Sequence, residues 1–260
     1  MLRAFSTAAT GMSAQQKMVD TIANNLANIN TNGYKRRQPI FEDLLYVKLQ
    51  EAGREVSSGI TAPGEVEIGS GVKLAATTKV FSPGELENTG RAEDMAITGD
   101  GFFQITLPNG ETRYTRDGSF QTNADGELVT SSGYTLEPAI TVPPDATGIS
   151  IGPDGTVTAK VGDVQQSLGQ IQLARFPNNG GLRSEGGNLF SETESSGSAT
   201  IGTPGDSGFG QIQGGFLEKS NVQMVSELVN LITAQRAYEI NSRAIKTGDG
   251  MLQTANQLIR

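Results

Sequence analysis

The sequence contains no cysteine, no histidine and no tryptophan among its 260 residues. Without cysteine the chain forms no disulfide, which is compatible with reducing and oxidising compartments alike. Histidine is the commonest general base and the commonest metal ligand, so its absence together with that of cysteine argues against zinc sites and histidine-activated nucleophiles. We therefore expect no metal and no cofactor, while carboxylate chemistry stays open.

Long runs of apolar or of basic residues are also missing. No stretch of about 18 apolar residues occurs, so the sequence predicts no membrane insertion. Gln15, Gln16 and Lys17 interrupt the N-terminal region, which predicts that any export proceeds without a cleaved signal peptide. The net charge is −8, so nucleic acid is not an expected partner.

Residues 1–32 predict a long helix, because their apolar side chains repeat every seven positions. Gly33 is expected to end this helix at its C′ position. Ser, Thr, Gln and Asn dominate the opposite face, which indicates that neighbours cover this face as well. One row of the heptad consists of Phe5, Met12, Val19 and Leu26, and the other of Ala8, Gln15, Ile22 and Ile29.

A second long helix is predicted at the C-terminus. Ser220 fits an N-cap, and Gln223 three residues later completes a capping-box pattern. Gly248 and Gly250 interrupt the helix at a cost of about 1 kcal/mol each, so a bend is expected near them. A row with a period of seven consists of Met224, Leu231, Tyr238, Ile245, Leu252 and Ile259.

Two apolar-striped helices at the chain ends predict a coiled-coil-like pair that leaves further apolar surface uncovered. Such a chain completes its core by joining copies of itself, so the sequence favours self-assembly over catalysis. The expected assembly interface consists of Phe5, Met12, Val19, Ile22, Leu26, Ile29, Met224, Leu228, Leu231, Tyr238, Ile245, Leu252 and Ile259.

The middle of the chain predicts an antiparallel β-rich body, which makes the fold class α+β. The sequence has 33 glycines, and hairpin signals such as Pro108-Asn109-Gly110 separate short runs with a period of two. Residues 40–46 fit a short helical turn, residues 51–71 an extended or loop segment, and residues 191–210 an exposed loop. The expected domains are residues 1–34 pairing with 218–260, a linker at 35–72, and a β-rich domain at 73–217.

Two weaker patterns favour other functions. Residues 123–126 (NADG) are similar to a calcium loop, but Gln121 and Ser132 occupy the positions of its end ligands, so a turn is the better interpretation. Glu85, Glu87, Glu93 and Asp94 could include the carboxylate pair of a hydrolase acting on the cell wall. An adaptor or cap-like module of fixed small oligomeric state is a third possibility.

Three stretches resemble the bacterial flagellar rod and hook proteins. Residues 23–35 (ANNLANINTNGYK) are similar to the N-terminal signature of that family, and residues 99–104 (GDGFFQ) are similar to its shared β-domain. Residues 228–241 (LVNLITAQRAYEIN) are similar to the C-terminal signature. The signature residues are Asn24, Asn25, Asn28, Asn30, Gly33, Tyr34, Gln235, Arg236, Tyr238 and Asn241.

The resemblance implies a structural, non-enzymatic subunit that polymerises into a helical tube and transmits torque from motor to hook. Chain length and residues 138–143 (PAITVP) favour the distal rod over the proximal rod or the hook. Implied partners are further copies of the chain, proximal rod proteins, the hook protein, the surrounding basal-body rings and the type III export apparatus. The implied location is the basal body, across the periplasm.

Overall fold

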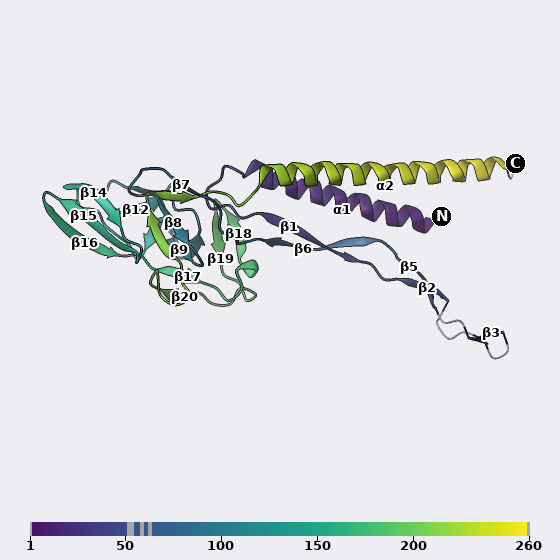
Figure 1. Cartoon of the computed structure of the whole chain (residues 1–260), viewed down its shortest axis with the longest axis horizontal. Coiled ribbons are helices and arrows are strands. Elements are labelled where there is room, and N and C mark those ends of the chain that lie inside the picture. Colours follow the sequence, from purple (N-terminus) through teal and green to yellow (C-terminus); the bar gives the residue numbers. More distant parts are fainter. Residues whose placement is uncertain (1, 51–54, 58–59, 62–63, 259–260) are drawn as a thin grey trace. The chain divides into compact units, whose positions relative to one another are not determined.

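The computed structural model describes residues 2–50, 55–57, 60–61 and 64–258. The fold is α+β, as predicted, with one helix near each terminus and a β-rich body between them (Figure 1). The chain divides into two compact units. Unit 1 contains Met1–Leu26, Arg37–Thr78 and Gln223–Arg260, and unit 2 contains Ala27–Arg36 and Lys79–Val222. The chain therefore passes four times from one unit to the other.

Unit 1 contains the two terminal helices, α1 (Leu2–Ala27) and α2 (Met224–Leu258), which lie side by side (Figure 1). Glycines mark two points of close approach. A Cβ atom added at Gly11 would lie 2.9 Å from Asn241 Nδ2, and one added at Gly248 would lie 2.8 Å from Phe5 Cζ. The predicted bend at Gly248 is wrong, because α2 is one unbroken helix in which this glycine makes room for the Phe5 ring.

The predicted C-terminal end of α1 and the predicted start of α2 are both wrong. α1 ends at Ala27 and not at Gly33, because asparagine-rich turns follow, in which the Thr31 N–H donates to Asn28 O at 3.2 Å. α2 begins four residues after Ser220. The Ser220 hydroxyl instead accepts a hydrogen bond from the Val222 N–H at 3.3 Å, so Ser220 belongs to the strand-to-helix connection.

A long two-stranded arm completes unit 1 (Figure 1). The predicted helical turn at 40–46 is wrong, because this segment pairs with a distant strand, and a tertiary partner overrides weak local propensity. Most of the predicted loop at 51–71 is part of the same arm, although 51–54, 58–59 and 62–63 lie outside the described residues. The paired strands are β1 (Arg37–Asp43) with β6 (Val72–Lys79), β2 (Val47–Gln50) with β5 (Val66–Ile68), and β3 (Glu55–Ser57) with β4 (Ile60–Thr61).

The main sheet of unit 2 is antiparallel and has the order β11-β12-β13-β9-β10-β19-β18, with β17 pairing both β9 and β20. The predicted turns at 108–110 and 123–126 join β9 to β10 and β11 to β12. Its strands are β9 (Phe102–Thr106), β10 (Thr112–Thr115), β11 (Phe120–Thr122), β12 (Leu128–Thr130), β13 (Thr135–Glu137), β17 (Leu173–Arg175), β18 (Arg183–Gly186), β19 (Leu189–Ser191) and β20 (Thr200–Gly202).

Three smaller sheets complete unit 2. The predicted exposed loop at 191–210 is wrong in part, because it contains β20 and the fully buried Ser196. The smaller sheets are β14 (Ala146–Ile151), β15 (Thr156–Val161) and β16 (Val164–Gln170); β8 (Met95–Thr98) with β21 (Gln211–Gly214); and β7 (Leu86–Asn88) with β22 (Phe216–Glu218). A short 3-10 turn, η1, spans Asn179–Gly181.

Two apolar clusters form the core of unit 2. The larger is built around Phe103 and Phe120, whose rings meet edge to face with centroids 5.4 Å apart. The smaller is aromatic and places Phe102 against Phe176 and Phe190. Burial of these rings makes the main favourable contribution to the free energy of folding of unit 2. Charged side chains beside such a core are shielded from water.

Candidate functional site

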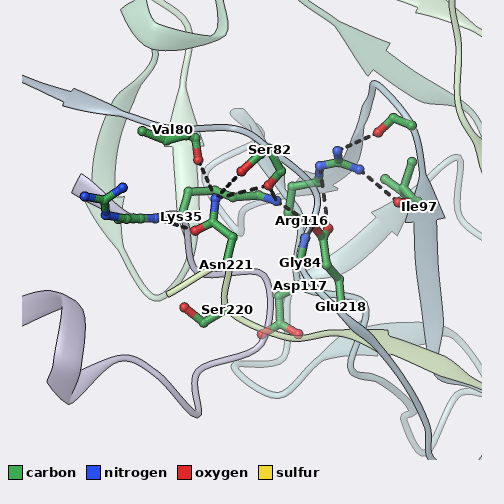
Figure 2. Close-up of polar contacts among 12 residues, drawn as sticks. Lys35, Val80, Ser82, Gly84, Ile97, Arg116, Asp117, Glu218, Ser220 and Asn221 are labelled. Carbon is green, nitrogen blue, oxygen red and sulfur yellow. Dashed lines mark hydrogen bonds and ion pairs between the residues drawn. The ribbon is translucent and has the colours of Figure 1, made fainter. Parts of the chain in front are cut away.

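A cluster of buried charges lies in unit 2 where strand β22 ends (Figure 2). We call it the Glu218 cluster; it comprises Lys35, Ser82, Gly84, Arg116, Glu218 and Asn221. Glu218 is the last residue of β22, and both its carboxylate and the Lys35 ammonium are about 1% exposed. Charged side chains are almost never buried so completely unless they are paired, which makes this cluster the candidate functional site.

Gly33 brings the N-terminal segment to this cluster. Its N–H donates to Glu218 O at 2.7 Å, and its backbone has a φ of +66°, in the left-handed region that favours glycine. A Cβ atom at this position would lie 2.6 Å from Asp117 N. Glycine is therefore required at position 33 by a close backbone approach and not by the end of a helix.

The Glu218 carboxylate is the centre of the cluster. Its Oε1 accepts hydrogen bonds from Lys35 Nζ at 2.5 Å and from the Gly84 N–H at 2.9 Å. Its Oε2 lies 3.8 Å from Arg116 Nε. Arg116 also donates to Ile97 O and Gly99 O, which anchors the guanidinium to β8 and to the turn after it (Figure 2).

The electrostatics of the cluster are unbalanced, with two buried cations around one buried carboxylate. Burial lowers the pKa of Lys35 below its ordinary value; Glu218 opposes this shift and Arg116 adds to it. Burial also lowers the pKa of Arg116, again against the effect of Glu218. Glu218 thus keeps both cations in place, and the arrangement serves to hold chain segments together.

Asn221 ties together the same chain segments. Its Oδ1 accepts a hydrogen bond from the Arg36 N–H at 2.7 Å, and its Nδ2 lies within bonding distance of Val80 O, Ser82 O and Ser82 Oγ. The Lys35 ammonium reaches Ser82 O as well, at 3.0 Å. Side chains from the segments that contain residues 35, 82 and 221 therefore interlock within unit 2.

An asparagine plays a similar part in unit 1. Asn25 on α1 donates through Nδ2 to Arg37 O at 2.9 Å, and its Oδ1 accepts from the Arg37 N–H at 2.9 Å. Nδ2 also lies 3.4 Å from Glu227 Oε2, a buried carboxylate on α2. One side chain thus joins α1, the first residue of β1 and α2.

The predicted signature residues divide into two groups. Asn25, Gly33 and Asn241 make the close contacts described above, and Asn28 accepts from the Thr31 hydroxyl at 3.2 Å. Tyr34 is half-buried beside Lys35 in the chain. The exposed members are Asn24, Asn30, Gln235, Arg236 and Tyr238.

The predicted assembly residues also differ in burial. On α1, Ile22 is buried, and Phe5, Met12, Val19 and Leu26 are half-buried; Ile29, in the turn after α1, is half-buried as well. On α2, Leu231, Ile245 and Leu252 are half-buried, whereas Met224, Leu228 and Tyr238 are exposed. Ile259 lies outside the described residues. Gln16, Val19, Gln235, Tyr238 and Glu239 line an open hollow of about 420 Å³ along the two helices.

Sequence reasoning missed Glu218, Arg116 and Asn221 as site residues. Lys35 ended the quoted N-terminal signature, but nothing in its spacing from Asn221 indicates that the two residues lie close together. A charged residue within a short strand is usually solvent-facing, so Glu218 gives no signal without the fold.

The acidic residues considered for hydrolysis have structural contacts. Glu87 pairs with Lys219 at 3.0 Å, Glu85 O accepts from the Lys219 N–H, and the buried Asp94 accepts from the Thr89 hydroxyl. Across the described part of the chain, no group of three or more acidic side chains is placed to hold a metal ion. None of its described helices is long and apolar enough to cross a membrane.

Comparison with known proteins identifies relatives along the whole chain. Residues 5–35 match the model for "Flagella basal body rod protein", 96–159 the "Flagellar hook protein FlgE/F/G D1 domain", and 213–258 the "Flagellar basal body rod FlgEFG protein C-terminal". The chain is similar to the flagellar basal-body rod protein FlgG of Caulobacter vibrioides, with 49% identity over 99% of each chain. It is also similar to FlgG of Borreliella burgdorferi (47%, all of each chain) and of Buchnera aphidicola from Schizaphis graminum (47%, 96% of each chain).

Proposed function

The chain belongs to the flagellar basal-body rod and hook protein family and is a structural subunit of the rod, and we propose that it builds the distal rod by packing its terminal helices against those of further copies. Similarity to FlgG proteins over the full length supports the distal position. In this proposal the helices form the inner layer of a tube and unit 2 its outer layer. The tube transmits torque from the motor to the hook.

The observation that carries the proposal is an apolar row on α2 that no described residue covers. It consists of Val225, Val229, Ile232 and Ile240, which are 57–76% exposed. At about 100° per residue these positions fall within an arc of about 80°. The buried Glu227 and Ala234 lie on the opposite side of α2. Arg236 and Arg243 fall in the same arc. A helix face that remained in water would carry polar residues in place of the four large apolar ones, so the outward row favours a partner surface.

A second copy of the chain is the occupant that we assign to this row. Unit 1 contains ten acidic and ten basic residues, so its net charge is zero, and copies can approach through their helices without net repulsion. A contact between unlike faces of two copies generates an open helical filament when the rotation between the copies does not close into a ring. A tube built in this way would be stiff, because densely packed interiors resist compression.

Within each subunit, we propose that α1 and α2 pair as a coiled-coil-like core. Ile22 and Ala234 are 2% and 3% exposed, and Gly248 accommodates the Phe5 ring. These contacts lie along the side of α2 opposite to the outward row. Burial on that side contributes about 25 cal/mol per Å² of apolar area, and the outward row stays available for neighbours.

The remaining partners follow from the place of a rod subunit in the flagellum. We propose contacts with proximal rod proteins below, the hook protein above and the surrounding rings outside, after export through the flagellar type III apparatus without leader cleavage. This places the subunit in the basal body across the periplasm. A non-enzymatic role agrees with the structural relatives.

The experiment that tests the proposed function is electron microscopy of purified full-length protein after concentration. We expect straight tubes from the natural chain and none from Ile232→Asp, because a charge in the outward row cannot be desolvated against a neighbour. Ser226→Asp is the matched control, since it adds the same charge about 100° around α2 from Val225 and should still assemble.

Two results would contradict the proposal. Normal tubes from Ile232→Asp would remove the outward row from the interface. A fixed small oligomer of the natural chain, in place of an open polymer, would favour an adaptor or cap-like module. Circular dichroism of Ile232→Asp should match that of the natural chain, which excludes misfolding as the cause of lost assembly.

A further inference from the structure

The peptide that joins Arg36 to Arg37 is where the chain first passes from unit 2 to unit 1. All four main-chain polar groups of these two residues are hydrogen-bonded. Arg36 N donates to Asn221 Oδ1 at 2.7 Å, Arg36 O accepts from Val80 N at 2.9 Å, Arg37 N donates to Asn25 Oδ1 at 2.9 Å, and Arg37 O accepts from Asn25 Nδ2 at 2.9 Å.

Asparagine is suited to this task because its side-chain amide offers a donor and an acceptor with nearly the geometry of a peptide group. Asn25 uses both groups on Arg37, as a neighbouring strand would. Asn221 accepts from Arg36 N and donates to Val80 and Ser82. Each asparagine lies in the same unit as the residues that it binds.

Each asparagine also contacts another chain segment that lies next to a point where the chain passes between the units. Residue 80 follows the third crossing, and Asn221 itself precedes the fourth. In unit 1, Asn25 itself precedes the first crossing and contacts Glu227, a buried side chain just after the fourth. Asn221 therefore ties together the second, third and fourth crossings in unit 2, and Asn25 ties together the first, second and fourth in unit 1.

We propose that Asn25 and Asn221 are positioning residues that hold the backbone at the crossing, so that twist applied to one unit reaches the other through a fixed peptide. A chain has two soft dihedral angles per residue, and an unbonded connection would let them turn. The inference rests on the proposed function, because only a torque-bearing subunit needs a crossing that does not swivel.

Hydrogen exchange of individual backbone amides tests the proposal on the full-length monomer, by mass spectrometry with electron-transfer fragmentation. In the natural chain the Arg36 and Arg37 amides should exchange slowly. Asn221→Ala should speed exchange at Arg36 about tenfold, and Asn25→Ala should do the same at Arg37, as expected for the loss of one buried hydrogen bond. Asn221→Asp keeps the acceptor and should leave the Arg36 amide protected.

Spin-label distance measurements give a second readout, because the natural chain has no cysteine and two can be introduced cleanly. Labels at Thr147→Cys in unit 2 and Thr233→Cys in unit 1 should report a broader distance distribution in Asn25→Ala and Asn221→Ala. Asn109→Ala is the matched control. It removes two hydrogen bonds to Glu111 in an exposed hairpin turn and should leave the distribution unchanged.

Rapid exchange of both amides in the natural chain would overturn the proposal. So would faster exchange spread over every amide of a unit in either variant, because that result indicates general destabilisation. If natural tubes form but the distributions of both variants stay narrow, the positioning role fails and the rod function stands. If no tubes form but the distributions broaden, the rod function fails and the positioning role stands.

Discussion

At the scale of single residues, Glu218 shows how one buried carboxylate can organise a junction. It is hydrogen-bonded to Lys35 and to the Gly84 N–H, and it lies near Arg116. A buried ion pair adds little to stability when compared with well-packed apolar residues, but the loss of one partner leaves the other charge uncompensated. Glu218 is therefore more important for what it neutralises than for the energy of the pair.

The first prediction follows from this imbalance. Glu218→Gln should lower the free energy of unfolding by about 3–5 kcal/mol, because the buried Lys35 loses the carboxylate that it pairs with and the buried Arg116 loses a neighbouring negative charge. Glu87→Gln is the control, since Glu87 lies on the paired strand β7 but forms an exposed ion pair with Lys219. That change should cost less than about 1 kcal/mol. Urea unfolding followed by circular dichroism measures both, and equal losses would contradict the role of Glu218.

The residues of this cluster could not have been predicted from the sequence. Period and spacing indicate which residues share a helix or strand, but Lys35, Arg116 and Glu218 come from three distant segments that only the fold brings together. Gly33 was predicted to end the N-terminal helix. In the structure it instead allows a close backbone approach, and the helix ends before it.

At the scale of elements, long periodic segments were predicted well and their ends poorly. The heptad rows identified α1 and α2, and the turn signals at 108–110 and 123–126 identified two hairpins. The strand β1 was missed, because residues 40–43 owe their extended form to pairing with β6 and not to local preference. The resemblance to the rod and hook family is confirmed by the comparisons.

A second prediction concerns the two glycines of α2. Gly250 has no atom within 4 Å of an added Cβ, so Gly250→Ala should stabilise the helix by up to about 1 kcal/mol. Gly248→Leu should instead destabilise the helix pair, because its Cβ would lie 2.8 Å from the Phe5 ring and the longer side chain cannot fit beside it. Thermal unfolding, followed by the circular dichroism signal of the helices, should show a raised melting temperature for Gly250→Ala and a lowered one for Gly248→Leu. A stabilising Gly248→Leu would show that the two helices do not pack closely at this point.

At the scale of the whole molecule, the charge is divided unequally. Unit 2 contains eighteen acidic and ten basic residues and so carries the entire net charge of −8, whereas unit 1 is neutral. The part that we propose to pack densely is therefore free of net repulsion. The part proposed to lie outside is strongly anionic, which favours solubility of the free subunit.

A third prediction follows from this division. Assembly brings the anionic units 2 of many copies close together, so salt should promote it by screening their repulsion. The Debye length falls from about 30 Å at 0.01 M to about 8 Å at 0.15 M. The concentration of subunits needed for polymerisation, measured by sedimentation, should fall over this range. A rise in this concentration with added salt would indicate that attraction between opposite charges, and not apolar contact, drives assembly.

The division of unit 1 into three separate stretches also determines when it can form. α1 is made first during synthesis, but α2 exists only after residues 27–222 have been added. Closing so long a loop carries an entropic cost and slows folding relative to contacts between near neighbours. Unit 2 needs none of the residues after 222, so its folding can run ahead. The helix pair is therefore the last part of the subunit to take shape, and the surface that we propose for recruiting other copies is withheld until α2 has been made.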